Sequence, residues 1–165
     1  MVFFVNIILY FFLLLIFLPI KLCMKNLNKK ILITGGAGYI GQNLVSYFLK
    51  KKCKISVIDN LSTSRGVNKN LKKFINFYKI DLTNDKKVEF FFKKKNFDLI
   101  IHLAAFSGVQ EFNKNVLKSF NNNVLATKNI IIFGFKNPNT KLIFSSSAAV
   151  YGKVARNKIS ENYPC

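Results

Sequence analysis

The sequence predicts an α/β fold in which a doubly wound parallel sheet, incomplete at one edge, is preceded by one hydrophobic N-terminal helix. Two observations predict this fold. Short apolar runs alternate with helical segments along the chain after residue 24. The first of these runs leads into a glycine-rich turn and then a helix, a pattern typical of parallel strands buried on both faces. Because such crossovers are right-handed, helices are expected on both faces, giving a Rossmann-like layer.

The expected elements follow one another without a linker or an internal repeat. Strands are expected at residues 31–34, 55–58, 77–80, 99–103 and 142–144. Helices are expected at residues 39–50, 71–74, 86–95 and 116–135. After Tyr151 only a polar tail remains, so we expect the sheet to lack the elements that would cover its last edge.

The N-terminal segment forms a unit of its own, so residues 1–24 and 25–165 are treated as two parts. Residues 2–20 are almost wholly apolar, which is the length that one membrane-spanning helix needs. No basic segment precedes the run and no small-residue cleavage site follows it, unlike in a signal peptide. Lysines follow it instead, which predicts a cytoplasmic location for residues 25–165 and a membrane anchor at residues 2–20. The alternative is that the protein starts at Met24.

The composition places few limits on the partners. The formal charge is +19, from 26 basic and 7 acidic residues, and only Arg65 and Arg156 are arginine. Short lysine runs at helix ends favour a solvated surface over a nucleic-acid site, while a general attraction for anionic ligands or membranes stays open. The three cysteines, Cys23, Cys53 and Cys165, form no paired motif. They indicate a reducing compartment and no metal site.

The glycine-rich turn is the first candidate site. Gly35, Gly38 and Gly41 recur at every third position between the first strand and the first helix. Such glycines permit a tight turn, a close approach of backbone to a pyrophosphate, and close packing of helix on strand. The amides of Tyr39 and Ile40, at the start of the helix, are then expected to face the phosphates.

Acidic residues follow the second and third strands. Asp59 ends the second strand at the spacing from the glycines that suits a carboxylate binding both adenosine ribose hydroxyls. Because that carboxylate would repel a 2′-phosphate, NAD is favoured over NADP as the cofactor. Asp81 ends the third expected strand, where it meets the adenine or is simply a strand-end residue.

Three further polar features fall within the apolar pattern. His102 lies in an apolar strand without an obvious partner, so we interpret it as a packed structural residue rather than a general base. Residues 121–123 are three asparagines inside a helix, where they form a polar surface or one amide reaches the cofactor. Residues 145–147 are serines at the end of a central strand, where ligands bind in open α/β sheets.

Together these motifs resemble the extended short-chain dehydrogenase/reductase family, and within it the branch of UDP-glucose 4-epimerases. The matching segments, in order, are Thr34-Gly-Gly-Ala-Gly-Tyr-Ile-Gly41, Asp59-Asn-Leu-Ser62, His102-Leu-Ala-Ala105, Asn122-Asn-Val124, Ser145-Ser-Ser-Ala-Ala-Val-Tyr-Gly152, Glu161 and Pro164. The resemblance covers the chain from about Lys29 onwards.

The resemblance implies a role for each matching position. It places Asp59 through Ser64, including Asn60, at the adenosine ribose, and Asp81 with Leu82 near the adenine. It places Ser147 at the sugar hydroxyl that is oxidised. The positions that it places along the rest of the cofactor are Leu103, Ala104, Ala105, Ser107 and Asn122. One departure is Ser107, since the epimerases commonly have lysine there. Loss of that cation is expected to weaken phosphate binding or to indicate a divergent branch of the family.

The resemblance also implies NAD as cofactor, a UDP-sugar as substrate, a homodimer for a full-length protein, and interconversion of UDP-glucose and UDP-galactose through a 4-keto intermediate. The catalytic Tyr-x-x-x-Lys pair of the family is expected beyond Cys165, so we expect the 165-residue chain alone to be inactive. A nucleotide-sugar dehydratase or decarboxylase of the same family, and a non-catalytic NAD-binding membrane protein, remain alternatives.

Overall fold

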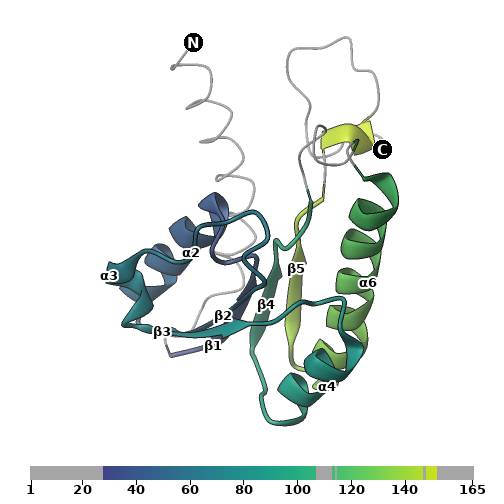
Figure 1. Cartoon of the computed structure of the whole chain (residues 1–165). Helices are drawn as coiled ribbons and strands as arrows, with labels where there is room; N and C mark the ends of the chain where they lie inside the picture. The colour runs from purple at the N-terminus through teal and green to yellow at the C-terminus, as the bar shows by residue number, and fades with distance from the viewer. Residues whose placement is uncertain (1–27, 107–112, 114, 147, 152–165) are drawn as a thin grey trace, which may run out of the picture.

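The structure is a computed structural model and describes residues 28–106, 113, 115–146 and 148–151. Five parallel strands form one sheet in the order β3-β2-β1-β4-β5 (Figure 1). The strands are β1 Lys30–Thr34, β2 Lys54–Asp59, β3 Ile75–Lys79, β4 Leu99–His102 and β5 Lys141–Phe144. The helices are α2 Tyr39–Lys50, α3 Lys69–Lys72, α4 Asp85–Lys93, α6 Val116–Gly134 and the 3₁₀ helix η1 Ala148–Tyr151. The predicted doubly wound sheet is confirmed.

Two apolar clusters hold the helices to opposite faces of the sheet. Successive strand residues point to opposite faces, so β1 contributes Ile31 and Ile33 to one cluster and Leu32 to the other. The first cluster includes Leu44, Val45 and Phe48 of α2. The second joins α4, through Val88, Phe91 and Phe92, to Ala126 and Ile130 of α6. Figure 1 shows α2 and α6 on the two sides of the sheet.

The strand order creates a switch point between β1 and β4. From β1 the chain moves outward to β2 and β3, then crosses back over the sheet to β4 and β5. Leu32 pairs with Ile100, and Thr34 pairs with His102 at the carboxyl ends of the two strands. Connections leave β1 and β4 towards different faces, so the loops that follow Thr34 and His102 diverge. Ligands of open α/β sheets bind at this place.

Asparagine caps explain where three helices begin. Asn68, Asn84 and Asn115 each accept a backbone amide two or three residues later, at 2.9, 3.0 and 2.9 Å. The cap at Asn68 starts α3 two residues earlier than predicted, and β3 also starts earlier, at Ile75. The prediction that Asp81 ends the third strand is therefore wrong, because β3 ends at Lys79.

The phenylalanines of α4 divide between core and solvent. Phe91 and Phe92 are buried, and Phe91 stacks on Phe97 while Phe92 meets the same ring edge to face. Phe90, by contrast, is 61% exposed, and the ammonium of Lys94 lies 4.6 Å from its ring centre. Val88 lies three and four residues before these two buried rings, so the three side chains form the apolar inner face of α4.

The expected hydrophobic N-terminal helix at residues 2–20 lies outside the described residues. Within the described part of the chain, no helix is long and apolar enough to cross a bilayer.

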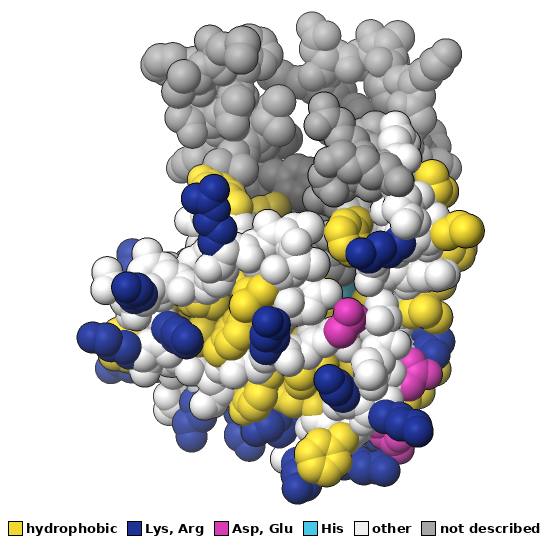
Figure 2. Space-filling view, viewed as in Figure 1, with side chains coloured by type: hydrophobic (Ala, Val, Ile, Leu, Met, Phe, Trp, Pro, Cys, Tyr) yellow, Lys and Arg dark blue, Asp and Glu magenta, His cyan; other side chains and the backbone are white. Residues whose placement is uncertain are grey.

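Lysine side chains are spread over the face seen in Figure 2 and extend along its lower edge, with few acidic groups among them. Among the lysines, Lys93 pairs with Glu89 at 3.1 Å and Lys128 pairs with Asp85 at 3.0 Å. Such exposed pairs contribute about 0–1 kcal/mol each. This distribution agrees with the interpretation of a solvated basic surface.

Candidate functional site

The glycine turn closes over the carboxyl end of β1. The amide of Gly35 donates to the Ile58 carbonyl at 2.8 Å, and the amide of Gly38 donates to the Gly35 carbonyl at 3.1 Å. Gly35 has φ +67°, in the left-handed region that favours glycine. These bonds fold residues 35–38 into a turn whose next residue, Tyr39, begins α2.

Neighbouring backbone leaves no room for side chains at two of these positions. A Cβ at Gly35 would lie 2.8 Å from the Ala104 amide nitrogen, so the turn is in contact with the loop after β4. A Cβ at Gly41 would lie 2.5 Å from the Gly35 carbonyl oxygen and from the Cα of Gly36. At Gly38, by contrast, a Cβ would meet one atom within 4 Å among the described residues that do not adjoin it, the Gly35 oxygen at 3.3 Å. Gly41 therefore serves packing, while Gly38 leaves the backbone approachable.

The N-terminus of α2 points out of this turn. Its cap residue is Gly38, which makes no side-chain cap hydrogen bond, and its first turn contains no acidic residue. The first amides of a helix have no partner within the helix and carry a partial positive charge. The predicted amides of Tyr39 and Ile40 belong to this group. They suit an anionic ligand such as a phosphate.

Gln42 fastens the turn to the next loop, a role that the sequence analysis missed. Its Nε2 donates to the Ala37 carbonyl at 2.9 Å, and its Oε1 accepts the amide of Asn68 at 2.9 Å. Asn68 is in turn the cap of α3. The half-buried side chain of Gln42 on α2 thus connects the glycine turn to the segment after β2.

Asp59 joins the same two segments at their centre. Its Oδ2 accepts the Ala37 amide at 3.0 Å, while its Oδ1 accepts the Leu61 amide at 2.8 Å and the Ser64 hydroxyl at 3.3 Å. An ionised carboxylate has about four acceptor sites. One site therefore remains for a ligand hydroxyl, and the long Ser64 bond is the one that a second hydroxyl would replace.

Asn60 and Asp81 connect the loops after β2 and β3. The Asn60 Nδ2 donates to Asp81 at 3.4 Å, and Thr83 donates to Asp81 through its amide and hydroxyl at 2.9 and 2.8 Å. Partial burial opposes ionisation of Asp81, but the bonds from Thr83 and Asn60 and the charge of Lys87 together lower its pKa. Leu82 is 5% exposed, and its side chain belongs to the cluster beneath α4 and α6.

His102 has two side-chain partners, so the expectation that it lacks one is wrong. Its Nδ1 lies 2.6 Å from the Thr34 hydroxyl, and its Nε2 lies 3.1 Å from the Thr127 hydroxyl. The ring is 2% exposed, and burial lowers its pKa to about 4. It is therefore neutral near pH 7, as the structural interpretation requires. Thr34 was recognisable in the sequence as the polar end of an apolar strand.

The loop after β4 is held by Asn123. Its Oδ1 accepts the Phe106 amide at 2.8 Å, and its Nδ2 donates to the Phe106 carbonyl at 3.2 Å. Leu103, Ala104 and Ala105 lie between this clamp and the end of β4. Of the three consecutive asparagines, Asn122 is half-buried and Asn121 is exposed. The amide with a structural role is thus the neighbour of the one assigned to the cofactor.

Two predicted positions, Ser107 and Ser147, lie outside the described residues. Ser145 follows β5, and its amide donates to the His102 carbonyl at 3.3 Å, which brings the serine segment to the switch point. A tyrosine and a lysine four positions apart occur at the end of α2, as Tyr47 in the helix and Lys51 at its C-cap. Tyr47 packs against the apolar cluster near the end of α2 that is remote from the glycine turn. That pair is not placed for chemistry at the switch point.

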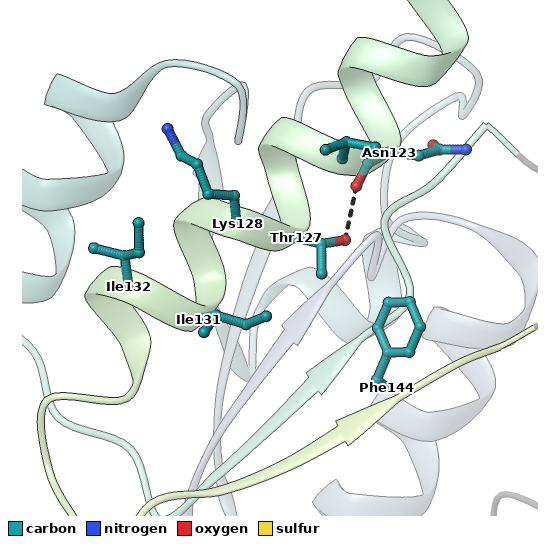
Figure 3. A pocket seen from close by; sticks show the side chains of 7 residues that line it. Asn123, Thr127, Lys128, Ile131, Ile132 and Phe144 are labelled. Atoms are coloured by element: carbon teal, nitrogen blue, oxygen red, sulfur yellow. Dashed lines mark hydrogen bonds between the residues drawn. The ribbon is translucent and has the colours of Figure 1, made fainter.

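A separate groove of about 580 Å³ runs along α6 and the end of β5 (Figure 3). Apolar side chains dominate it, among them Val124, Ile131, Ile132 and Phe144. Thr127 lies in the groove and donates to the Asn123 carbonyl at 2.7 Å, the dashed line in Figure 3. The polar groups suited to a nucleotide are at the glycine turn, so the groove is a different feature from the candidate site.

The sequence matches the NAD dependent epimerase/dehydratase family over residues 31–165. Among curated relatives, the UDP-glucose 4-epimerase of Dictyostelium discoideum is 36% identical over 146 residues, which cover 86% of this chain and 42% of that protein. A bifunctional UDP-glucose and UDP-xylose 4-epimerase of Pisum sativum is 36% identical over 147 residues, covering 84% of this chain and 40% of that protein.

Solved structures show the same similarity. The UDP-Glc/GlcNAc 4-epimerase of Campylobacter jejuni superposes with a TM-score of 0.73 at 38% identity, covering 83% of this chain and 43% of that one. The UDP-glucose 4-epimerase of Bifidobacterium longum, in complex with NAD+ and UDP, gives a TM-score of 0.74 at 29% identity, covering 82% and 42%. The chain therefore spans about two fifths of the length of the relatives that it matches.

Proposed function

The chain belongs to the NAD dependent epimerase/dehydratase family, and we propose that it is the NAD-binding portion of a UDP-glucose 4-epimerase-like enzyme. The observation that carries the proposal is the bond between the Ala37 amide and Asp59, which brings the glycine turn and the carboxylate together beside the switch point. A dinucleotide needs both, the turn for its pyrophosphate and the carboxylate for its adenosine ribose.

The described residues fit NAD. The open side of Gly38 admits a phosphate, and the amides of Tyr39 and Ile40 would bind it. Asp59 and Ser64 would bind the ribose hydroxyls, Asn60 and Asp81 would border the adenine, and the loop from Leu103 to Ala105 would line the middle of the cofactor. When bound, NAD supplies the hydride acceptor and donor for a sugar hydroxyl.

Calorimetric titration of the full chain with NAD and with NADP tests the cofactor. We expect binding of NAD and at least tenfold weaker binding of NADP, because Asp59 repels a 2′-phosphate. Equal binding of the two dinucleotides would contradict the role of Asp59, and no binding of either would contradict the proposed function.

The substrate is proposed to be a UDP-sugar whose reacting hydroxyl is held by Ser147. The catalytic Tyr-x-x-x-Lys pair is not supplied by Tyr47 and Lys51, so we expect the 165-residue chain to bind NAD without converting UDP-galactose to UDP-glucose. A coupled assay for UDP-glucose checks this, and turnover by the purified chain would contradict it. A chain extended by a segment carrying the pair is expected to be active.

Two further proposals concern the membrane attachment and the oligomeric state of the enzyme. Residues 2–20 are proposed to anchor it to a membrane, with residues 25–165 on the cytoplasmic side. Alkaline extraction of membranes separates an anchored protein from a peripheral one, and release of the full chain would exclude the anchor. A longer protein is proposed to be a homodimer, which sedimentation equilibrium measures directly.

A further inference from the structure

A continuous set of hydrogen bonds crosses the switch point from β1 through β4 to α6. It includes the hydroxyl of Thr34, the ring of His102 and the hydroxyl of Thr127, which come from three elements. At one end, Thr34 Oγ1 accepts the Ala104 amide at 3.3 Å and, at 3.2 Å, the Leu103 amide, which also donates to the Thr34 carbonyl at 3.1 Å. At the other end, Thr127 Oγ1 donates to the Asn123 carbonyl at 2.7 Å.

The two ends determine where each proton lies. A hydroxyl has one hydrogen and two acceptor sites. Because two amides occupy the acceptor sites of Thr34, its own hydrogen must point to Nδ1 of His102, 2.6 Å away. Because Thr127 donates its hydrogen to a carbonyl, it can only accept from Nε2. The ring is therefore the tautomer with hydrogen on Nε2 alone.

We propose that His102 is a positioning residue for the cofactor, holding the loop after β4 against the glycine turn through this proton arrangement. The inference rests on the proposed function, since the loop from Leu103 to Ala105 is the part that would line NAD. The same loop touches the turn, because a Cβ on Gly35 would be 2.8 Å from the Ala104 nitrogen. A shift of the loop therefore narrows or opens the cofactor site directly.

The loop is fixed at both of its ends by α6. Thr127 acts through His102 and Thr34 on the amides of Leu103 and Ala104, while Asn123 holds Phe106. These two α6 residues are one helical turn apart and are joined by the bond from Thr127 to the Asn123 carbonyl. Thr127 can therefore change the affinity for NAD without contacting the cofactor.

The tautomer is directly measurable because His102 is the only histidine of the chain. Uniform ¹⁵N labelling of histidine gives one imidazole, and its one-bond and long-range couplings identify which nitrogen carries hydrogen. We expect a hydrogen on Nε2 and a bare Nδ1 at pH 7. A hydrogen on Nδ1 would overturn the arrangement whether or not the protein binds NAD.

The positioning role is tested by NAD affinity in three variants. Thr127→Val removes the acceptor for Nε2 and is expected to weaken NAD binding about tenfold, while Thr127→Ser retains the hydroxyl and is expected to stay within about twofold of wild type. Thr140→Val is the matched control. Its buried hydroxyl also donates to a carbonyl at 2.7 Å, that of Phe97. Thr140 directly precedes β5, so it lies at the amino-terminal ends of the strands, away from the glycine turn.

The outcomes separate the two claims. A loss of NAD affinity in Thr127→Val alone supports the positioning role. The comparison requires that every variant shows a cooperative thermal unfolding transition, which demonstrates that it is folded. Equal losses in Thr127→Val and Thr140→Val, or unchanged affinity in both, would overturn it. A wild-type chain that binds no NAD would overturn the proposed function and the positioning role together, whereas the histidine spectrum would still decide the proton arrangement.

Discussion

The amide of Ala37, in the turn after β1, lies 3.0 Å from the carboxylate of Asp59, the last residue of the neighbouring strand β2. One oxygen of Asp59 is thus devoted to the glycine turn, and the other organises the loop from Leu61 to Ser64. Asp59, which is proposed to bind the ribose, therefore also sets the distance between the glycine turn and the loop after β2.

Asp59→Asn is expected to weaken NAD binding by at least tenfold. The amide would offer one acceptor in place of two, so the turn, the loop and the ribose could not all be satisfied. Calorimetry measures the affinity. Asp98→Asn is a matched control, because Asp98 accepts the Lys30 amide at 2.7 Å at the amino-terminal ends of β1 and β4, away from the glycine turn. An equal loss in both variants would count against a specific role for Asp59.

Alanine at two glycines should separate folding from binding. Gly41→Ala places Cβ 2.5 Å from backbone atoms that cannot rotate away, so we expect roughly 1–3 kcal/mol loss of unfolding free energy or more. Gly38→Ala meets one atom at 3.3 Å and should change stability little while obstructing the phosphate. Urea unfolding and NAD titration measure the two effects. NAD affinity of Gly38→Ala equal to wild type would refute the phosphate assignment.

Stability should depend on pH through His102. Its pKa is about 4 in the folded protein and about 6.5 when unfolded, so between these values the unfolded state binds more protons. The contribution of His102 to stability is then fully present above pH 6.5 and is lost as the pH drops towards 4, by about 3 kcal/mol in total. Urea unfolding across this range checks the slope. In His102→Asn the slope should disappear between pH 6.5 and 5, above the range in which Asp81 and Asp85 contribute. An unchanged slope there would assign it to other groups.

Asn129 is expected to be a stability determinant outside the candidate site. It is fully buried, and its Nδ2 donates to the Leu82 carbonyl at 2.8 Å and to Asp85 at 2.7 Å, joining α6 to the start of α4. Its Oδ1 has no partner among the described residues.

Asn129→Leu should therefore lower the unfolding free energy by about 1–3 kcal/mol, because the Leu82 carbonyl stays buried without a donor. The variant should also raise the pKa of Asp85, which the bonds from Asn129 and Lys128 lower. Lys128→Gln, which removes only an exposed ion pair, should stay within about 1 kcal/mol of wild type. Urea unfolding ranks the two variants, and the reverse order would contradict the assignment.

The sequence predicted the fold well where one periodicity dominated. Helix α2 has the predicted bounds, and β1 and β2 differ from prediction by one residue at each altered end. Prediction was poorer around β3, an edge strand whose residues are at most half-buried, so its apolar pattern is weak. The cap at Asn68 also shifted α3, because a side-chain hydrogen bond decided where that helix began.

The parts of the candidate site that follow a local spacing were predictable. Glycines and strand-end carboxylates occur at characteristic spacings, so Gly35 and Asp59 were proposed from the sequence, and the structure joins the glycine turn to Asp59 through the Ala37 amide. The contacts of His102 with Thr34 and Thr127 join positions 68 and 25 residues apart, and no local pattern encodes such pairs. Gln42 was missed for the same reason, since its partner is 26 residues away.

The position of β1 between β2 and β4 has a consequence for the order of events during synthesis. Its second neighbour lies 68 residues later in the chain, since Ile31 pairs with Leu99. Closing that long loop costs entropy that local contacts do not recover, so the β1–β4 pairing is expected to be among the slow steps of folding. The glycine turn is translated early, but Ala104, which packs against it, is translated only after β4. A nascent chain should therefore gain affinity for the dinucleotide only once β4 and the α6 residues that hold its loop, Asn123 and Thr127, have left the ribosome.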